Sequence, residues 1–179
     1  MSVDCDRSFN SYCDLGDCLE QLCHAAWAGG IILKLSKNFY LSELTRSQTA
    51  TRYGISNKPN TTQLRNLKIL CQQILQPVRD HFQQPVVVSS GYRSPLLNAR
   101  IGGSKTSQHC FGQAADFEIP GLPNKDVARW IRENLSFDQL ILEFYDGKNP
   151  NSGWIHCSHV DDNRRQTMVF NGKRYLTWG

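Results

Sequence analysis

Three side chains that can bind a metal ion are widely separated in this chain, and this separation constrains the fold most. His109 and Asp116 belong to the segment Ser107-Gln-His-Cys-Phe-Gly-Gln-Ala-Ala-Asp116, and His156 ends the segment Trp154-Ile-His some forty residues later. Neighbours on one helical face are three or four residues apart, so His109 and Asp116 indicate a loop that leads into a strand. Gly112 permits the turn, and Asp116 is predicted on the more polar face of that strand.

Two imidazoles and one carboxylate suit an open metal site. Three protein ligands leave the fourth position of a tetrahedral zinc to water, whereas structural zinc sites close all four positions, usually with thiolates. An open site of this kind is typical of hydrolytic enzymes. The alternative is that His109 ends a loop and Asp116 is an ordinary turn acid. The small residues around both favour the metal site.

Glu143 is the predicted general base. The apolar runs 139–145 and 154–160 flank a stretch of turn-forming residues and therefore predict an antiparallel hairpin. If Tyr145 faces Trp154, Glu143 faces His156, at about 5 Å between Cβ atoms. Another acid or His159 is the alternative base, although a regular strand would turn His159 to the opposite face.

The sequence resembles the zinc D-Ala-D-Ala carboxypeptidase family, which includes bacterial and phage cell-wall peptidases, endolysins and catalytically silent Hedgehog-type domains. The resemblance rests on the pattern Ser-x-His-x-x-Gly-x-Ala-x-Asp, on Trp-Ile-His, on the segment that begins at Phe39 and on Ser89-Ser-Gly-Tyr-Arg-Ser. It covers roughly residues 35 to 160. By position it implies that His109, Asp116 and His156 hold one zinc ion.

Arg93 and Ser107 are predicted to contact the substrate. Arg93 follows a predicted buried strand and the Gly91 bend, and its planar fork can bind a carboxylate or stabilise an oxyanion. The resemblance implies that Arg93 meets the peptide carbonyl or the terminal carboxylate of the substrate; the alternative is a surface arginine paired with a nearby acid. Ser107 is expected to bind substrate or to support the loop that carries His109.

The order of elements predicts an α+β domain, with an antiparallel sheet that carries the zinc site and helices on one face. Caps and stop residues predict helices over 42–53, 60–82, 94–100 and 125–134. Asn171-Gly172 predicts a terminal hairpin.

We predict a peptidase domain over residues 35–179 and an N-terminal extension over residues 1–34. The chain has 179 residues and seven cysteines, four of which crowd the extension: Cys5, Cys13, Cys18 and Cys23. Their spacing lacks the Cys-x-x-Cys pairs of zinc knuckles, which favours reduced thiols in a cytoplasmic setting. The acids before residue 25 argue against a signal peptide, and no apolar run reaches the length of a membrane span.

The resemblance implies a zinc peptidase that hydrolyses an amide bond in the stem peptide of peptidoglycan, as a D-Ala-D-Ala carboxypeptidase or as an endolysin-like endopeptidase. The alternative is a non-catalytic, zinc-stabilised domain that binds cell wall or forms part of a virion. We expect synthesis in the cytoplasm and action at the wall after lysis or from a virion. A net charge of +4 without interleaved aromatic residues argues against nucleic acid as a partner.

Overall fold

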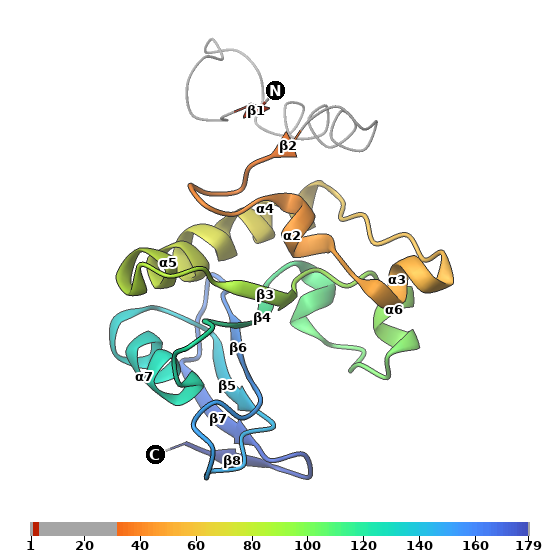
Figure 1. Ribbon diagram of the computed structural model, residues 1–179. Coiled ribbons are helices and arrows are strands. Elements are labelled where there is room, and N and C mark those ends of the chain that lie inside the picture. Colours follow the sequence, from red (N-terminus) through yellow and green to blue (C-terminus); the bar gives the residue numbers. More distant parts are fainter. Residues whose placement is uncertain (1, 4–31, 179) are drawn as a thin grey trace.

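The computed structural model describes residues 2–3 and 32–178 of the protein (Figure 1). The predicted N-terminal extension and its four cysteines therefore lie almost wholly outside the described residues. The helices are α2 (Leu41–Thr45), α3 (Gln48–Tyr53), α4 (Thr61–Leu70), the π-helix η1 (Cys71–Leu75), α5 (Gln76–Phe82), α6 (Pro95–Arg100), the 3-10 helix η2 (Gln108–Phe111) and α7 (Asn124–Asn134). The strands are β1 (Ser2–Val3), β2 (Ile32–Leu33), β3 (Val87–Ser90), β4 (Ala114–Glu118), β5 (Gln139–Glu143), β6 (Trp154–Ser158), β7 (Gln166–Phe170) and β8 (Tyr175–Thr177).

Six of the strands form one sheet in the order β3-β4-β6-β5-β7-β8. Its pairs are antiparallel except for β5 and β7, which run parallel. The predicted hairpins β5–β6 and β7–β8 are both present. The α+β class is confirmed, and the sheet is mostly antiparallel rather than wholly so. β1 and β2 form a separate parallel pair.

One face of the sheet lies against the hydrophobic core. Alternate residues of the central strands point to it and are fully buried, including Phe117, Leu140 and Ile155. The same buried cluster contains apolar residues of α4, η1 and α5 and of α7. Burial of these side chains is the main stabilising contribution to the fold.

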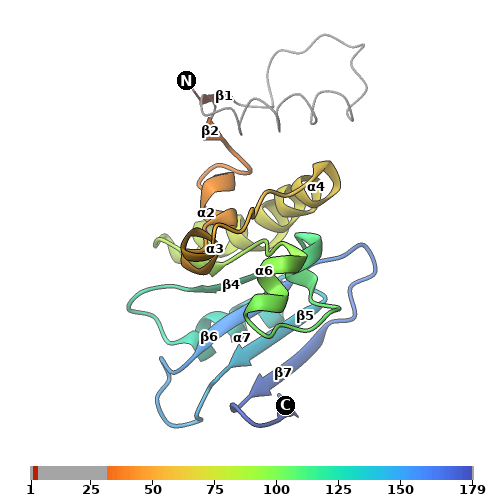
Figure 2. The same ribbon diagram turned by 90° about the vertical axis from the view of Figure 1, so that its right-hand side faces the viewer.

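The helices do not all lie on that face. Figure 2 shows α7 behind the sheet and α6 in front of it. We predicted helices on one face only, so α6 is a departure from that arrangement. The reason is local: β3 ends at Ser90, and the chain then passes into α6, which begins at Pro95 after the cap Ser94. Since α6 lies on the other face, the chain after it approaches the sheet from the side opposite the core.

The long helix predicted from Asn60 is confirmed, with one local change. The Asn60 side chain accepts a hydrogen bond from the Gln63 amide at 2.9 Å, and helical structure continues to Phe82. A π-helical turn over Cys71–Leu75 ends two residues before Pro77. Because proline lacks an amide donor and clashes with the preceding turn of an α-helix, a local widening there is expected.

The helix predicted over 42–53 is two short helices. α2 ends at Thr45, and Arg46 has extended backbone angles, so the chain turns before α3 begins. Ser47 then caps α3 by accepting a hydrogen bond from the Ala50 amide at 3.2 Å. The single helix predicted over 42–53 took no account of this second cap at Ser47. Within the described residues, no helix is long and apolar enough to cross a membrane.

Candidate metal centre

The three predicted ligands lie together on the face of the sheet that points away from the core. Asp116 on β4 is directly opposite His156 on β6, and η2 brings His109 to them. The distance from Asp116 Oδ1 is 2.8 Å to His156 Nδ1 and 3.2 Å to His109 Nε2. The two imidazole nitrogens are 3.3 Å apart. One nitrogen from each ring and one carboxylate oxygen therefore form a compact triangle.

Backbone contacts around Gly91 fix the orientation of the His109 ring. His109 Nδ1 lies 2.7 Å from the carbonyl oxygen of Gly91, to which it donates as N–H. That tautomer leaves the Nε2 lone pair directed at Asp116 and His156. Gly91 lies against the backbone of Leu44, where a Cβ atom would collide with the carbonyl group. A larger residue at this position would shift the backbone, including the Gly91 carbonyl that orients His109.

Burial and the neighbouring groups together set the protonation states of His109 and Asp116. His109, Asp116 and His156 are each at least nine-tenths buried. Burial is the main cause that lowers the pKa of His109, which favours the neutral ring. Burial alone would raise the pKa of Asp116, but the charges and hydrogen bonds of His109 and His156 outweigh it, and the pKa falls below its ordinary value. A neutral imidazole and an ionised carboxylate are the forms that bind metal.

The donor set fits zinc. Nitrogen and oxygen donors at about 2.0–2.1 Å from a tetrahedral zinc lie roughly 3.3 Å from one another. Two of the three donor separations match that value, and the third, between His156 and Asp116, is shorter, as in a hydrogen bond. Among the described residues, this is the one group of His, Cys, Asp and Glu side chains with the geometry of a metal site. Zinc binding itself stays a prediction.

Arg93 lies at the edge of the triangle. Its guanidinium Nη2 is 3.5 Å from Asp116 Oδ2, and its side chain is 17% exposed. The Nε atom is buried and has no hydrogen-bond partner among the described residues. The alternative for Arg93 was a surface arginine paired with a nearby acid. Arg93 does pair with an acid, Asp116, but this contact lies inside the site rather than on the outer surface. Arg93 therefore retains donors for a further group there.

Glu143 lies on the same face, but not opposite His156. It pairs with Trp154, and Ile141 pairs with His156, so the predicted register is wrong by two residues. The cause is the end of the hairpin, where Phe144 has a positive φ of 54° and leaves the strand, so that Tyr145 does not pair with Trp154. Side chains two residues apart along a strand share a face. Glu143 thus keeps the predicted side of the sheet and is diagonal to His156.

Aromatic side chains flank Glu143 across the sheet. The register aligns Trp154, Glu143, Phe170 and Tyr175 in one row on four neighbouring strands. The rings of Phe170 and Tyr175 are 4.6 Å apart between centroids. Burial raises the pKa of Glu143, and Asp116 raises it further, while His156 and Arg93 act in the opposite direction. A carboxyl with a raised pKa close to a metal centre suits proton transfer.

The remaining predicted residues have no chemical contact with the triangle. Ser107 begins η2 through its backbone, and its hydroxyl does not cap that helix. His159 follows β6 and donates its backbone amide to Gln113. Burial raises the pKa of the Cys110 and Cys157 thiols, as expected for residues in a packed interior. The predicted substrate role of Ser107 stays a prediction.

Sequence reasoning missed a second buried carboxylate, Asp138, just before β5. The guanidinium of Arg164 binds it with two hydrogen bonds, of 2.7 Å to Oδ1 and 2.6 Å to Oδ2. Gln108, the neighbour of His109, donates its side-chain amide to Oδ2 at 2.8 Å. The only sequence signal was a charged residue at the start of an apolar run, which does not distinguish a buried acid from a turn acid.

Comparisons with known proteins agree with this arrangement. The zinc D-Ala-D-Ala carboxypeptidase of Streptomyces albus G is 28% identical to this chain over 116 residues. The aligned region covers 64% of this chain and 44% of the relative, so the chain spans less than half of the relative's length. The sequence model of Peptidase M15 matches residues 37–158, which include all three residues of the triangle, Arg93 and Glu143. This chain therefore belongs to the Peptidase M15 family.

Proposed function

We propose that this protein is a zinc-dependent peptidase that hydrolyses an amide bond in the stem peptide of peptidoglycan. The observation that supports it best is the convergence of two imidazole nitrogens and one carboxylate oxygen within 3.3 Å of one another. Membership of the Peptidase M15 family and the similarity to a zinc D-Ala-D-Ala carboxypeptidase point to the same chemistry. The zinc ligands would be His109, Asp116 and His156.

When bound, zinc supplies a Lewis acid that polarises the scissile carbonyl and lowers the pKa of water. The chain has to hold the side chains that bind the metal in one orientation. His109 is oriented by the Gly91 carbonyl, and Asp116 is held between two imidazoles. Hydrogen-bond partners of this kind fix the position of a histidine ring and raise its affinity for the metal.

Glu143 would take a proton from the attacking water and deliver it to the departing nitrogen. Its burial raises the pKa, which brings the carboxyl closer to neutral pH than an exposed glutamate. Trp154 and Phe170 stand on either side of it and limit its contact with water. Proton transfer of this kind contributes about 10²–10⁴ to the rate.

Arg93 would stabilise the negative charge that develops on the carbonyl oxygen. Its guanidinium is 3.5 Å from Asp116, which keeps it at the edge of the metal centre. A positioned cation beside a tetrahedral intermediate is typically worth about 10² or more in rate. Stabilisation of this oxygen by Arg93 would be the same in an endopeptidase and in a carboxypeptidase. In a carboxypeptidase, Arg93 would also have the terminal carboxylate of the substrate as a partner.

The test measures zinc content and hydrolysis together. Purified protein is incubated with peptidoglycan, and released D-Ala and new amino termini are quantified. We expect about one zinc per chain and hydrolysis in the wild type, loss of zinc in His109→Ala, and loss of hydrolysis with retained zinc in Glu143→Gln. Glu133→Gln on the exposed side of α7 is the matched control and should keep full activity.

The products separate the remaining possibilities. Free D-Ala identifies a carboxypeptidase, and new internal amino termini identify an endopeptidase. Zinc-loaded wild type that binds peptidoglycan without releasing either product would refute the enzymatic proposal and identify a zinc-stabilised wall-binding or virion domain. Hydrolysis that persists after complete zinc removal would refute the metal mechanism.

A further inference from the structure

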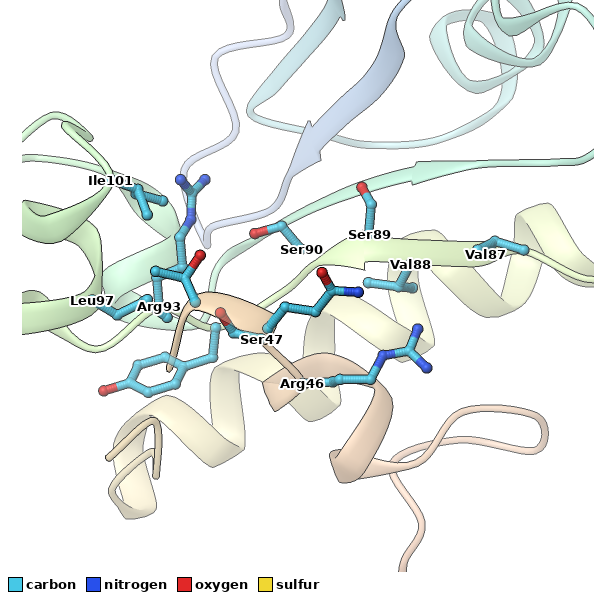
Figure 3. Close-up of a pocket in the computed structure, with 12 residues that line it drawn as sticks. Arg46, Ser47, Val87, Val88, Ser89, Ser90, Arg93, Leu97 and Ile101 are labelled. Carbon is cyan, nitrogen blue, oxygen red and sulfur yellow. The ribbon is translucent and has the colours of Figure 1, made fainter. Parts of the chain in front are cut away.

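A cleft of about 670 Å³ lies along β3, and its lining residues include Arg93 (Figure 3). One side is β3 with Tyr92 and Arg93, and the other is the turn between α2 and α3, which contains Arg46 and Ser47. The side chains Leu97 and Ile101 of the α6 region complete it. Its volume falls within the range of about 300–1,000 Å³ that is usual for ligand sites.

Arg93 connects the cleft to the candidate metal centre, because it lines the cleft and contacts Asp116. The Ser90 end of β3 pairs with Asp116, and the Val87 end pairs with Glu118, two residues further along β4. Arg93 marks the same end as Ser90, because it contacts Asp116. In Figure 3, Arg46 lies below Val88, away from Arg93, and Val87 is the labelled residue farthest from Arg93. A chain bound at the metal centre can therefore follow β3 towards Arg46.

The outer edge of β3 suits an extended peptide. β3 is the first strand of the six-stranded sheet and pairs with β4 on one side only. An edge strand presents backbone N–H and C=O groups that an incoming extended chain can use. Val87–Ser90 spans roughly 13 Å at about 3.3 Å per residue, which corresponds to about three or four residues of bound peptide.

The charge of the residues that line the cleft favours an acidic ligand. It is lined by two arginines, and none of the described residues that line it is an Asp or a Glu. Within residues 32–178, no carboxylate lies in ion-pair distance of Arg46, and its side chain is exposed. The guanidinium is always charged and binds carboxylates with two parallel hydrogen bonds. Arg46 is thus available for an anion that is not part of the described chain.

We propose that the cleft binds the substrate peptide in extended form along β3, and that Arg46 binds a free side-branch carboxylate of that peptide about two to four residues from the scissile bond. This inference rests on the proposed peptidase function. It adds the location of a subsite and its chemical preference for an acidic peptide. In a stem peptide that contains D-Glu, the free carboxylate of that residue is the group that fits.

Two synthetic stem pentapeptides test the subsite, one with the free D-Glu carboxylate and one with that carboxylate converted to an amide. The wild type should cleave the acidic peptide with a KM about tenfold lower and a similar kcat, as expected for a charge-assisted hydrogen bond at a partly exposed site. Arg46→Gln should raise KM for the acidic peptide about tenfold and leave the amide peptide unchanged. Arg46→Lys should restore part of the difference, and Arg52→Gln on α3 should behave as wild type.

Direct binding separates this inference from the proposed function. Calorimetry measures the affinity of each peptide for the metal-free wild type and for Arg46→Gln, so no hydrolysis is required. Tighter binding of the acidic peptide that disappears in Arg46→Gln supports the subsite, even if neither peptide is cleaved. Equal affinity of the wild type for both peptides, or an unchanged preference in Arg46→Gln, overturns the subsite even if hydrolysis is observed.

Discussion

Replacement of Asp138 by Asn tests how the structure supports the metal centre. The Asp138 carboxylate accepts both hydrogen bonds of the Arg164 guanidinium, the backbone amide of Arg164 and the side-chain amide of Gln108. Asparagine has nearly the same shape but carries no charge and has one acceptor oxygen in place of two. The change therefore removes the ion pair and leaves at least one of the donors unpaired, without creating a cavity.

The expected loss of stability is about 2 kcal/mol. Hydrogen bonds from Arg164 lower the pKa of Asp138 from 3.8 to about 2, and each pKa unit corresponds to about 1.4 kcal/mol. Asp138 is 1% exposed, so solvent does little to weaken the interaction. The side chain of Arg164 is 58% exposed and regains water in the variant, which keeps the loss below the roughly 3–5 kcal/mol of a fully buried pair.

The pH dependence identifies the cause. Because the folded pKa is depressed, the contribution of Asp138 is complete above about pH 4 and is lost as the pH falls through about 2. Urea unfolding of metal-free wild type and Asp138→Asn should differ by about 2 kcal/mol at pH 7 and converge near pH 2. The variant should also bind zinc more weakly, since Gln108 precedes His109. Equal stability of the two proteins at pH 7 would refute the reasoning.

Three further outcomes follow from the site. Phe170→Ala should move the acidic limb of the pH–rate profile to lower pH, because exposure of Glu143 reverses the burial that raises its pKa; an unmoved limb would show that Phe170 does not shield it. Gly91→Ala should lower stability by about 1–3 kcal/mol and weaken zinc binding, since a Cβ collides with the Leu44 carbonyl; unchanged zinc affinity would contradict the role of the Gly91 carbonyl. Thiol alkylation at pH 7 should leave hydrolysis intact, whereas inactivation at Cys110 would favour a thiol mechanism.

The convergence of the three candidate ligands could be predicted from the sequence because these residues occur in a short pattern and on strands with a period of two. His109, Asp116 and His156 needed only a turn and one strand pairing to meet. The register of β5 against β6 could not be predicted in the same way. It depends on where the chain leaves the strand, and the positive φ of Phe144 is set by contacts that have no local signature.

Contacts between distant segments account for the other omissions. Asp138 is buried because Arg164, 26 residues later, folds back on it. The parallel pairing of β5 with β7 depends on the same return of the chain. A sequence pattern indicates which segments are strands, but the partner of each strand depends on the path of the intervening chain. The cleft along β3 likewise exists only when α2, α3 and β3 are brought together.

The terminal hairpin β7–β8 can be exchanged separately from the part of the chain that carries the three candidate ligands. The match to the family ends at residue 158, before this hairpin begins, yet Phe170 and Tyr175 provide one wall beside Glu143. The ligand triangle is complete without the hairpin. Grafting a different hairpin after Arg165, which keeps the pair of Arg164 with Asp138, would therefore change the pKa of Glu143 while the three candidate ligands stay in place. This segment is thus a natural place to engineer the working pH of the protein.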